Sequence, residues 1–112
     1  MGGIEAGTLY GTMNLLALQA LRDGPIHGLG VMKKLERDTG GALRIEEGAL
    51  YPALHRLERD GLIEGKWGLT EGKRRAKFYR LTTPGREQLE TEEKGWNRMV
   101  KAISLILQPQ ES

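Results

Sequence analysis

The chain has 112 residues, of which 38% are hydrophobic and 29% charged, a balance typical of a single folded domain. No apolar run reaches the roughly 18 residues that span a bilayer, and the first eight residues, MGGIEAGT, lack the basic start and apolar stretch of a secretory signal. Cysteine is absent, which excludes disulfides and thiolate metal sites. We therefore expect a cytoplasmic protein that contacts no membrane.

The formal net charge is only +2, but the charge is unevenly distributed. Residues 66–80 carry six lysines and arginines against one glutamate, whereas residues 84–112 carry four basic and five acidic side chains. A local concentration of cations is the usual electrostatic signature of a protein that binds nucleic acid. The segment around residue 73 is therefore the first candidate for a functional surface.

Two helices are predicted before this segment. The first, over residues 9–22, is apolar around much of its circumference and ends at the Asp-Gly-Pro sequence of residues 23–25. The second, over residues 27–39, ends at a pair of glycines. It presents Lys33 to solvent, where a cation can contact a DNA phosphate.

A third helix is predicted from about Glu46 to Asp60. Its apolar residues recur at i, i+3, i+4 and i+7, which predicts one face packed on a core. The opposite face begins with small residues that permit close approach to a DNA groove, and continues with hydrogen-bond donors for bases or phosphates. Its candidate DNA contacts are Gly48, Ala49, Tyr51, His55 and Arg56. Pro52 predicts a kink or a tightened first turn within this helix.

Two strands, near residues 62–67 and 76–82, flank a loop that contains Gly72 and predict a hairpin. The cations at and beside its tip are Lys73, Arg74, Arg75 and Lys77. A basic hairpin beside a helix with a polar outer face predicts a winged helix-turn-helix, in which the helix enters a groove and the wing binds phosphates. We therefore expect an α+β, mostly helical fold with a two-stranded wing.

A last helix is predicted from Thr83-Pro84, a cap residue and a first-turn proline, to about Leu107. Steps of four and three residues define a stripe in which five of six positions are apolar: Leu89, Glu93, Trp96, Val100, Ile103 and Leu107. A helix of about 35 Å extends well beyond a small core, so the stripe needs a partner helix. We expect a homodimer through this stripe, with Leu16 of the first helix contributing, although the stripe could also cover the chain's own core. The predicted division is a DNA-binding domain, residues 1–83, and a dimerisation helix, residues 84–112.

The sequence resembles the PadR family of bacterial transcriptional regulators. The resembling segments are GPIHGLGVMKKLE at 24–36, EEGALYPALHRLERDGLIE at 46–64 and GKRRAKFYRLTTPG at 72–85. The resemblance implies a dimeric repressor whose third helix enters the major groove of a palindromic operator, with Tyr51 and the wing tip in contact with DNA. Many members have serine or threonine where this chain has Ala49, so a hydroxyl contact is lost there. The single terminal helix is similar to that of the shorter subfamily.

Small aromatic or lipophilic compounds act as effectors of some relatives, and a tryptophan on the last helix stacks on them. The resemblance therefore implies ligand binding for Trp96, whereas the residue pattern alone favours a packing anchor at the interface. The identity of the effector, the operator and the sign of regulation do not follow from the sequence. No cofactor or metal is expected.

An enzyme is not expected, because His27 and His55 lie on different predicted helices and no phosphate loop, nucleophile elbow or metal-spaced cluster occurs. The alternative to a specific regulator is a winged-helix module that senses small molecules or binds proteins and has only weak, non-specific DNA affinity. Specific binding that survives competitor DNA yet weakens steeply with salt would distinguish the two.

Overall fold

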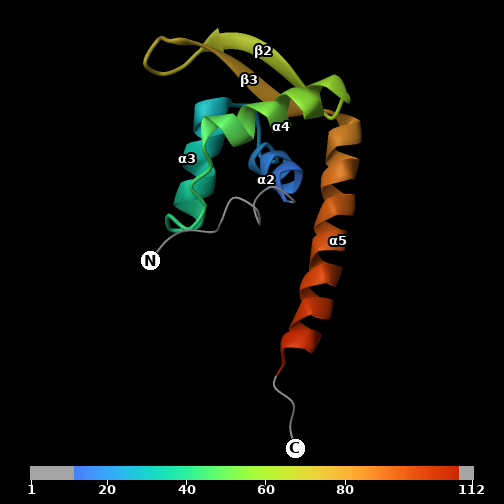
Figure 1. The fold of residues 1–112 in the computed structure, drawn as a ribbon. Helices are drawn as coiled ribbons and strands as arrows, with labels where there is room; N and C mark the ends of the chain where they lie inside the picture. The colour runs from blue at the N-terminus through green and yellow to red at the C-terminus, as the bar shows by residue number, and fades with distance from the viewer. Residues whose placement is uncertain (1–11, 109–112) are drawn as a thin grey trace, which may run out of the picture.

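The computed structural model describes residues 12–108 of the chain. Figure 1 shows a group of helices beneath a small sheet and a long terminal helix that descends from it. In chain order the elements are α2 (Met13–Ala20), β1 (Ile26–His27), α3 (Gly28–Asp38), α4 (Glu47–Arg59), β2 (Ile63–Leu69), β3 (Arg75–Leu81) and α5 (Thr83–Leu107). No helix of the described residues is long and apolar enough to cross a membrane.

The predicted helices and hairpin are confirmed, with shifts at their ends. Helix α2 ends at Ala20 rather than at residue 22, and the predicted start of this helix at residue 9 lies outside the described residues. The wing strands pair in antiparallel register from Ile63↔Leu81 to Leu69↔Arg75, so β2 begins one residue later and ends two residues later than predicted. Helix α4 runs without a break through Pro52, and Ala49 N–H donates to the Glu46 carbonyl (3.0 Å) as in a tightened first turn.

The sheet contains a third strand that the sequence did not predict. Ile26 and His27 pair with Tyr79 and Phe78, which gives the order β1-β3-β2. His27 is the predicted first residue of the second helix, but it has extended backbone and immediately precedes α3. Two residues are too few to show a strand periodicity in the sequence. The extended conformation of this segment depends on its pairing with β3.

The core lies where α2, α3 and α4 meet beneath the sheet. The inward stripe of α4 is completely covered, with Leu50, Leu54 and Leu57 at most 1% exposed. These residues pack in one cluster with Ala17 and Leu18 of α2. Each fully buried leucine contributes about 2 kcal/mol from removal of apolar surface from water. This burial fixes the rotation of α4 about its axis, and therefore which residues face outward.

Helix α5 is attached at its start to the turn between α4 and β2. Its cap is Thr82, one residue earlier than predicted: the Thr82 hydroxyl accepts from Gly85 N–H (3.1 Å) and donates to the Gly61 carbonyl (2.7 Å). Gly85 lies directly against the Leu62 carbonyl, where any Cβ would overlap it. These contacts hold the first turn of α5 against the turn that joins α4 to β2.

Beyond its first turns, α5 packs on α2 and then leaves the core (Figure 1). Leu89 is 5% exposed and belongs to the chain's own core. The start of the apolar stripe therefore packs within the chain's own core, and the predicted place of Leu89 in a dimer interface stays a prediction. From Trp96 onward, all residues of α5 are exposed.

Glu92 lies half-buried on α5, and its Oε2 has no hydrogen-bond partner. Burial raises the pKa of the Glu92 carboxyl, and a hydrogen bond with Gln88 only partly opposes this. The folded state therefore binds the proton more tightly than the unfolded state does. Below its ordinary pKa of 4.5, the carboxyl does not lower the free energy of unfolding. As the pH rises through the raised pKa of the folded state, the carboxyl loses its proton and the free energy of unfolding falls.

We predict that Glu92→Gln increases the free energy of unfolding at pH 7 by about 1 kcal/mol, because it removes a poorly solvated charge. The gain should disappear near pH 4, where the wild-type carboxyl is protonated in both states. Urea unfolding at the two pH values and equal protein concentration measures this. A gain of the same size at both pH values would contradict the assignment to the charge.

Candidate nucleic-acid interface

A groove of about 900 Å³ lies between the wing and the two helices α3 and α4. Its floor comes from the outer side of α4 and the first turns of α3, and its roof is the inner face of the wing. The predicted DNA contacts that line it are Lys33, Tyr51, His55, Arg74, Arg75 and Lys77. The fold thus brings cations and hydrogen-bond donors from three separate sequence segments to one opening.

Tyr51 lies across the junction of α3 and α4. It is half-buried and packs against the edge of the core. Its hydroxyl is close to Gly28, since a Cβ added to that glycine would be 2.6 Å from Tyr51 Oη. The first turn of α3 receives no side-chain hydrogen bond from its cap residue, His27. The Tyr51 hydroxyl therefore lies beside the N-terminal end of α3, and the N-terminus of a helix favours an anion such as a phosphate oxygen.

The outer side of α4 is open at its start. Gly48 and Ala49 are exposed, and a Cβ added to Gly48 would have no atom within 4 Å. His55 is exposed one turn beyond Tyr51, and Arg56 is half-buried. Gly48, Ala49 and Arg56 lie outside the groove lining, so they extend the candidate surface along the helix.

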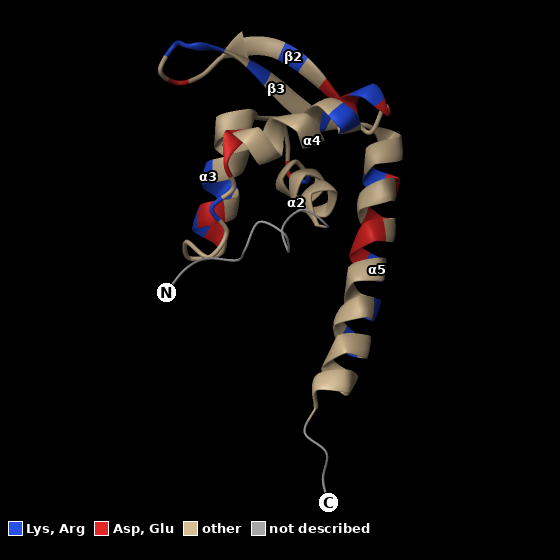
Figure 2. Ribbon diagram, viewed as in Figure 1, with Lys and Arg blue, Asp and Glu red and all other residues tan. Residues whose placement is uncertain are grey.

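The wing tip is a tight turn that gathers cations. Thr70 N–H donates to the Arg74 carbonyl and Lys73 N–H to the Thr70 carbonyl, both at 2.9 Å. Lys73 adopts a left-handed backbone conformation (φ 59°) to close the turn. Figure 2 shows the resulting concentration of basic residues at the end of the hairpin. All three tip cations, Lys73, Arg74 and Arg75, are exposed.

Two exposed apolar residues on the inner face of the wing were not predicted as site residues. Trp67 is 58% and Leu69 68% exposed, and both line the groove. The Arg75 guanidinium stacks 4.8 Å from the Trp67 ring centroid, which orients this cation. Strand alternation was the available signal, because it places Trp67 and Leu69 on the same face as the buried Ile63.

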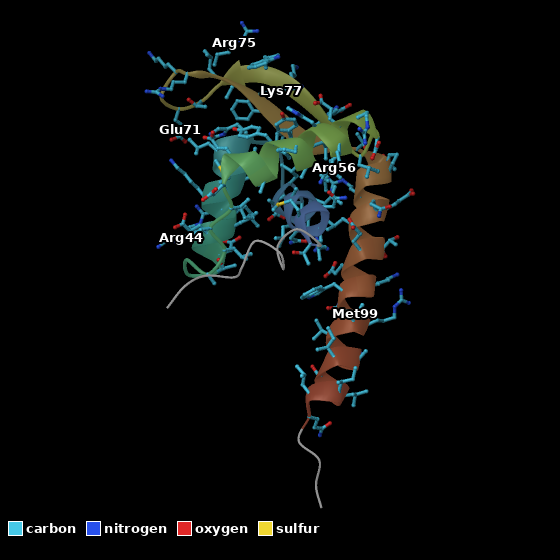
Figure 3. The ribbon with its side chains drawn as sticks, viewed as in Figure 1. Arg44, Arg56, Glu71, Arg75, Lys77 and Met99 are labelled. Carbon is cyan, nitrogen blue, oxygen red and sulfur yellow. The ribbon has the colours of Figure 1, made fainter. Side chains whose placement is uncertain are left out.

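Lys77 differs from the other predicted DNA contacts. Its Nζ donates to Glu58 Oε1 of α4 at 2.9 Å, and this hydrogen bond raises the pKa of the Lys77 ammonium against the opposing effect of burial. Figure 3 shows Lys77 closer to the helices than Arg75 is. Its charge is already engaged within the protein, so a direct phosphate contact from Lys77 stays a prediction.

A second candidate surface lies on the distal half of α5. Trp96, Val100 and Ile103 are 40–44% exposed, and Leu107 is 74% exposed. Met99, labelled in Figure 3, lies on this part of the helix away from the rest of the fold. Three further apolar residues of this half are exposed but do not belong to the predicted stripe: Met99, Leu105 and Ile106. Leu16 is half-buried against the core, and Glu93 lies 3.9 Å from Arg22 of its own chain.

Comparison with known proteins agrees with this geometry. The sequence model of the PadR-like family of transcriptional regulators matches residues 17–91. A transcriptional regulator of Mycobacterium tuberculosis is 31% identical over 91 residues, which are 81% of each chain.

Two solved structures have the same fold along nearly the whole chain. A transcriptional regulator from Clostridium thermocellum superposes with a TM-score of 0.83 at 27% identity, covering 94% of this chain and 99% of its own. A PadR family regulator from Eggerthella lenta has a TM-score of 0.77 at 32% identity, covering 93% and 88%. With the family model spanning α3, α4 and the wing, this chain belongs to the PadR-like family of DNA-binding transcriptional regulators.

Proposed function

We propose that this regulator is a sequence-specific homodimeric repressor that binds a palindromic operator and is released by a small effector. The observation that carries the proposal is that the outer side of α4 and the cationic wing tip open onto one groove. An α-helix fits the major groove of B-DNA, and a basic hairpin beside it can follow the flanking phosphates. A cytoplasmic location is part of the same proposal.

Within this proposal, the start of α4 reads bases. Gly48 and Ala49 are exposed and small, which allows the helix to approach base edges closely, and His55 and Arg56 supply donors further along the helix. Tyr51 has a different role. Because its hydroxyl lies at the first turn of α3, we assign it to a phosphate that fixes the depth and register of α4.

The dimer rests on the exposed part of the apolar stripe of α5, from Trp96 to Leu107. Apolar surface of this extent is uncommon on monomers. A second α5 packed on it in an antiparallel or crossed arrangement would bury the stripe and carry the two winged domains to symmetric positions. Such a dimer recognises two half-sites related by a two-fold axis.

Trp96 supports the effector part of the proposal. Its ring is 44% exposed on the stripe, so in the dimer it would lie between the subunits, where a planar aromatic or lipophilic compound could stack on it. Binding there would change the packing of the two α5 helices and thereby the distance between the two α4 helices of the dimer. Packing alone remains the alternative role of this ring.

We predict that Tyr51→Phe weakens operator binding about tenfold, because one charge-assisted hydrogen bond to a phosphate is lost. Tyr51→Ala should abolish recognition, since the ring that spaces α3 from α4 is removed as well. Fluorescence anisotropy with an operator and with scrambled DNA measures both. Unchanged operator affinity in both variants would remove Tyr51 from the interface.

A double substitution, Arg74→Ala with Arg75→Ala, should weaken binding to all sequences and reduce the slope of log K against log salt by roughly two, because about 0.9 is lost per phosphate contact. The matched control is Lys66→Ala with Arg80→Ala, which removes the same charge from residues outside the groove lining. An equal reduction in both double variants would indicate a general charge effect without a specific wing contact.

For the dimer, Ile103→Asp should yield monomers by sedimentation equilibrium, because a carboxylate cannot be buried unpaired in an apolar seam. Arg98→Asp, on the opposite side of α5, is the control and should remain dimeric. If Ile103→Asp stays dimeric, the subunits associate through another surface.

A further inference from the structure

One ion pair joins the wing to α4 away from the root of the sheet. Lys77 lies on β3 and Glu58 in the last turns of α4, with Nζ and Oε1 2.9 Å apart. Their side chains are 29% and 31% exposed. In every other ion pair of the described residues at least one partner is more than half exposed. Water screens this pair least, so its geometry is the best defined.

The path of the Lys77 side chain exists because residue 65 is a glycine. Gly65 faces Tyr79 in the register of the hairpin, and Lys77 lies diagonally across from it on the same face of the sheet. A Cβ on Gly65 would overlap Lys77 Cε and would lie 3.1 Å from Glu58 Oε2. The lysine therefore crosses the strand through the space that a side chain at position 65 would fill.

The ammonium is also held from below. Lys77 Nζ lies 5.6 Å from the ring centroid of Tyr79. Tyr79 is only 3% exposed, so the position of its ring is fixed by the surrounding core. A carboxylate on α4, an aromatic ring on β3 and a missing side chain on β2 thus combine to define one position for the ammonium group. The raised pKa of Lys77, caused first by the hydrogen bond to Glu58, keeps the group charged at every physiological pH.

This contact lies between the buried root of the wing and its exposed tip. The root is fixed by Ile63 and Leu81, which are 1% and 7% exposed. From residue 71 to residue 75 every residue is exposed, so none of these tip residues is buried against the helices.

Strand β1 extends the attachment of the root along β3 as far as Phe78, through the pair His27↔Phe78. Lys77 is the next residue toward the tip, so its ion pair with Glu58 adds an attachment beyond the end of the three-stranded part of the sheet and limits bending of the hairpin there.

We propose that Glu58 and Lys77 are positioning residues, whose ion pair over Gly65 sets the angle between the wing and α4 and so the spacing of the two DNA-contacting elements. The proposal rests on the proposed function, because the angle of the wing affects binding only if α4 and the wing tip both contact DNA. It assigns Lys77 to the support of the wing, in place of the phosphate contact predicted from the sequence.

The two roles for Lys77 predict opposite effects of Glu58→Gln. If Lys77 bound a phosphate directly, loss of the neighbouring carboxylate would free the ammonium and remove a repelling charge, so binding would strengthen. If the pair supports the wing, its loss weakens binding although the protein becomes more positive. Gly65→Ala provides an independent case, since it keeps both charges but forces the Lys77 side chain out of its path.

The test measures affinity for an operator selected from a random DNA library. We expect Glu58→Gln, Lys77→Gln and Gly65→Ala each to weaken binding roughly three- to tenfold, and the Glu58→Gln, Lys77→Gln double variant to be no weaker than the singles. The charge exchange Glu58→Lys with Lys77→Glu should recover most of the affinity. Glu64→Gln with Arg80→Gln, a cross-strand pair with exposed side chains, is the matched control and should bind as wild type.

A second readout follows wing position without DNA. Because the chain has no cysteine, nitroxide labels can be placed at Glu71→Cys on the wing tip and Glu47→Cys at the start of α4, with labelled chains diluted in unlabelled ones so that each dimer holds one labelled subunit. Dipolar spectroscopy should give a narrow distance distribution for wild type, a broad one for Glu58→Gln, and a narrow one again for the charge exchange.

Tighter or unchanged DNA binding by Glu58→Gln, or an unchanged distance distribution in that variant, would overturn the proposal. If instead the wild-type protein selects no DNA sequence while the distribution still broadens in Glu58→Gln, the proposed function fails and the role of the pair in holding the wing stands.

Discussion

The structure depends on the burial of one face of α4. Leu50, Leu54 and Leu57 are at most 1% exposed, and their packing against α2 leaves only one rotation of the helix about its axis. That rotation places Tyr51 at the start of α3 and His55 in the groove. The part of the proposed DNA-contacting surface that lies on α4 follows from this packing, because a helix turned by one residue would present a different set of side chains.

Elements with a period of their own could be predicted from the sequence. The leucines of the 13-residue helix α4 recur with helical spacing, so the inward and outward faces follow directly. The wing followed from two short strands around a glycine-containing loop. The strand at Ile26–His27 could not be predicted, because two residues carry no pattern and their pairing is decided by Tyr79 and Phe78.

The site was harder to predict than the fold wherever two segments distant in sequence meet. From the sequence, Lys77 is predicted to be one more DNA-contacting cation of a basic hairpin, since the sequence does not show that Glu58, 19 residues earlier, lies beside it. Trp67 is predicted only as a strand residue, because its stacking on Arg75 depends on the register of the two strands. Leu89 continued the apolar stripe of α5, yet where that helix leaves the core is determined by α2. Periodicity identifies apolar faces, but it does not identify what covers them.

If α4 reads DNA from the major groove in two symmetric copies, as we propose, the starts of the two helices lie near two separate places on the operator. Directed cleavage measures this: an iron chelate attached at Ala49→Cys, the chain's single thiol, cuts the DNA closest to the start of α4. On a selected operator we predict two clusters of cuts related by two-fold symmetry, with centres about 34 Å, or one helical turn, apart. Cuts spread evenly along the operator, or a single cluster without a symmetric mate, would contradict the account.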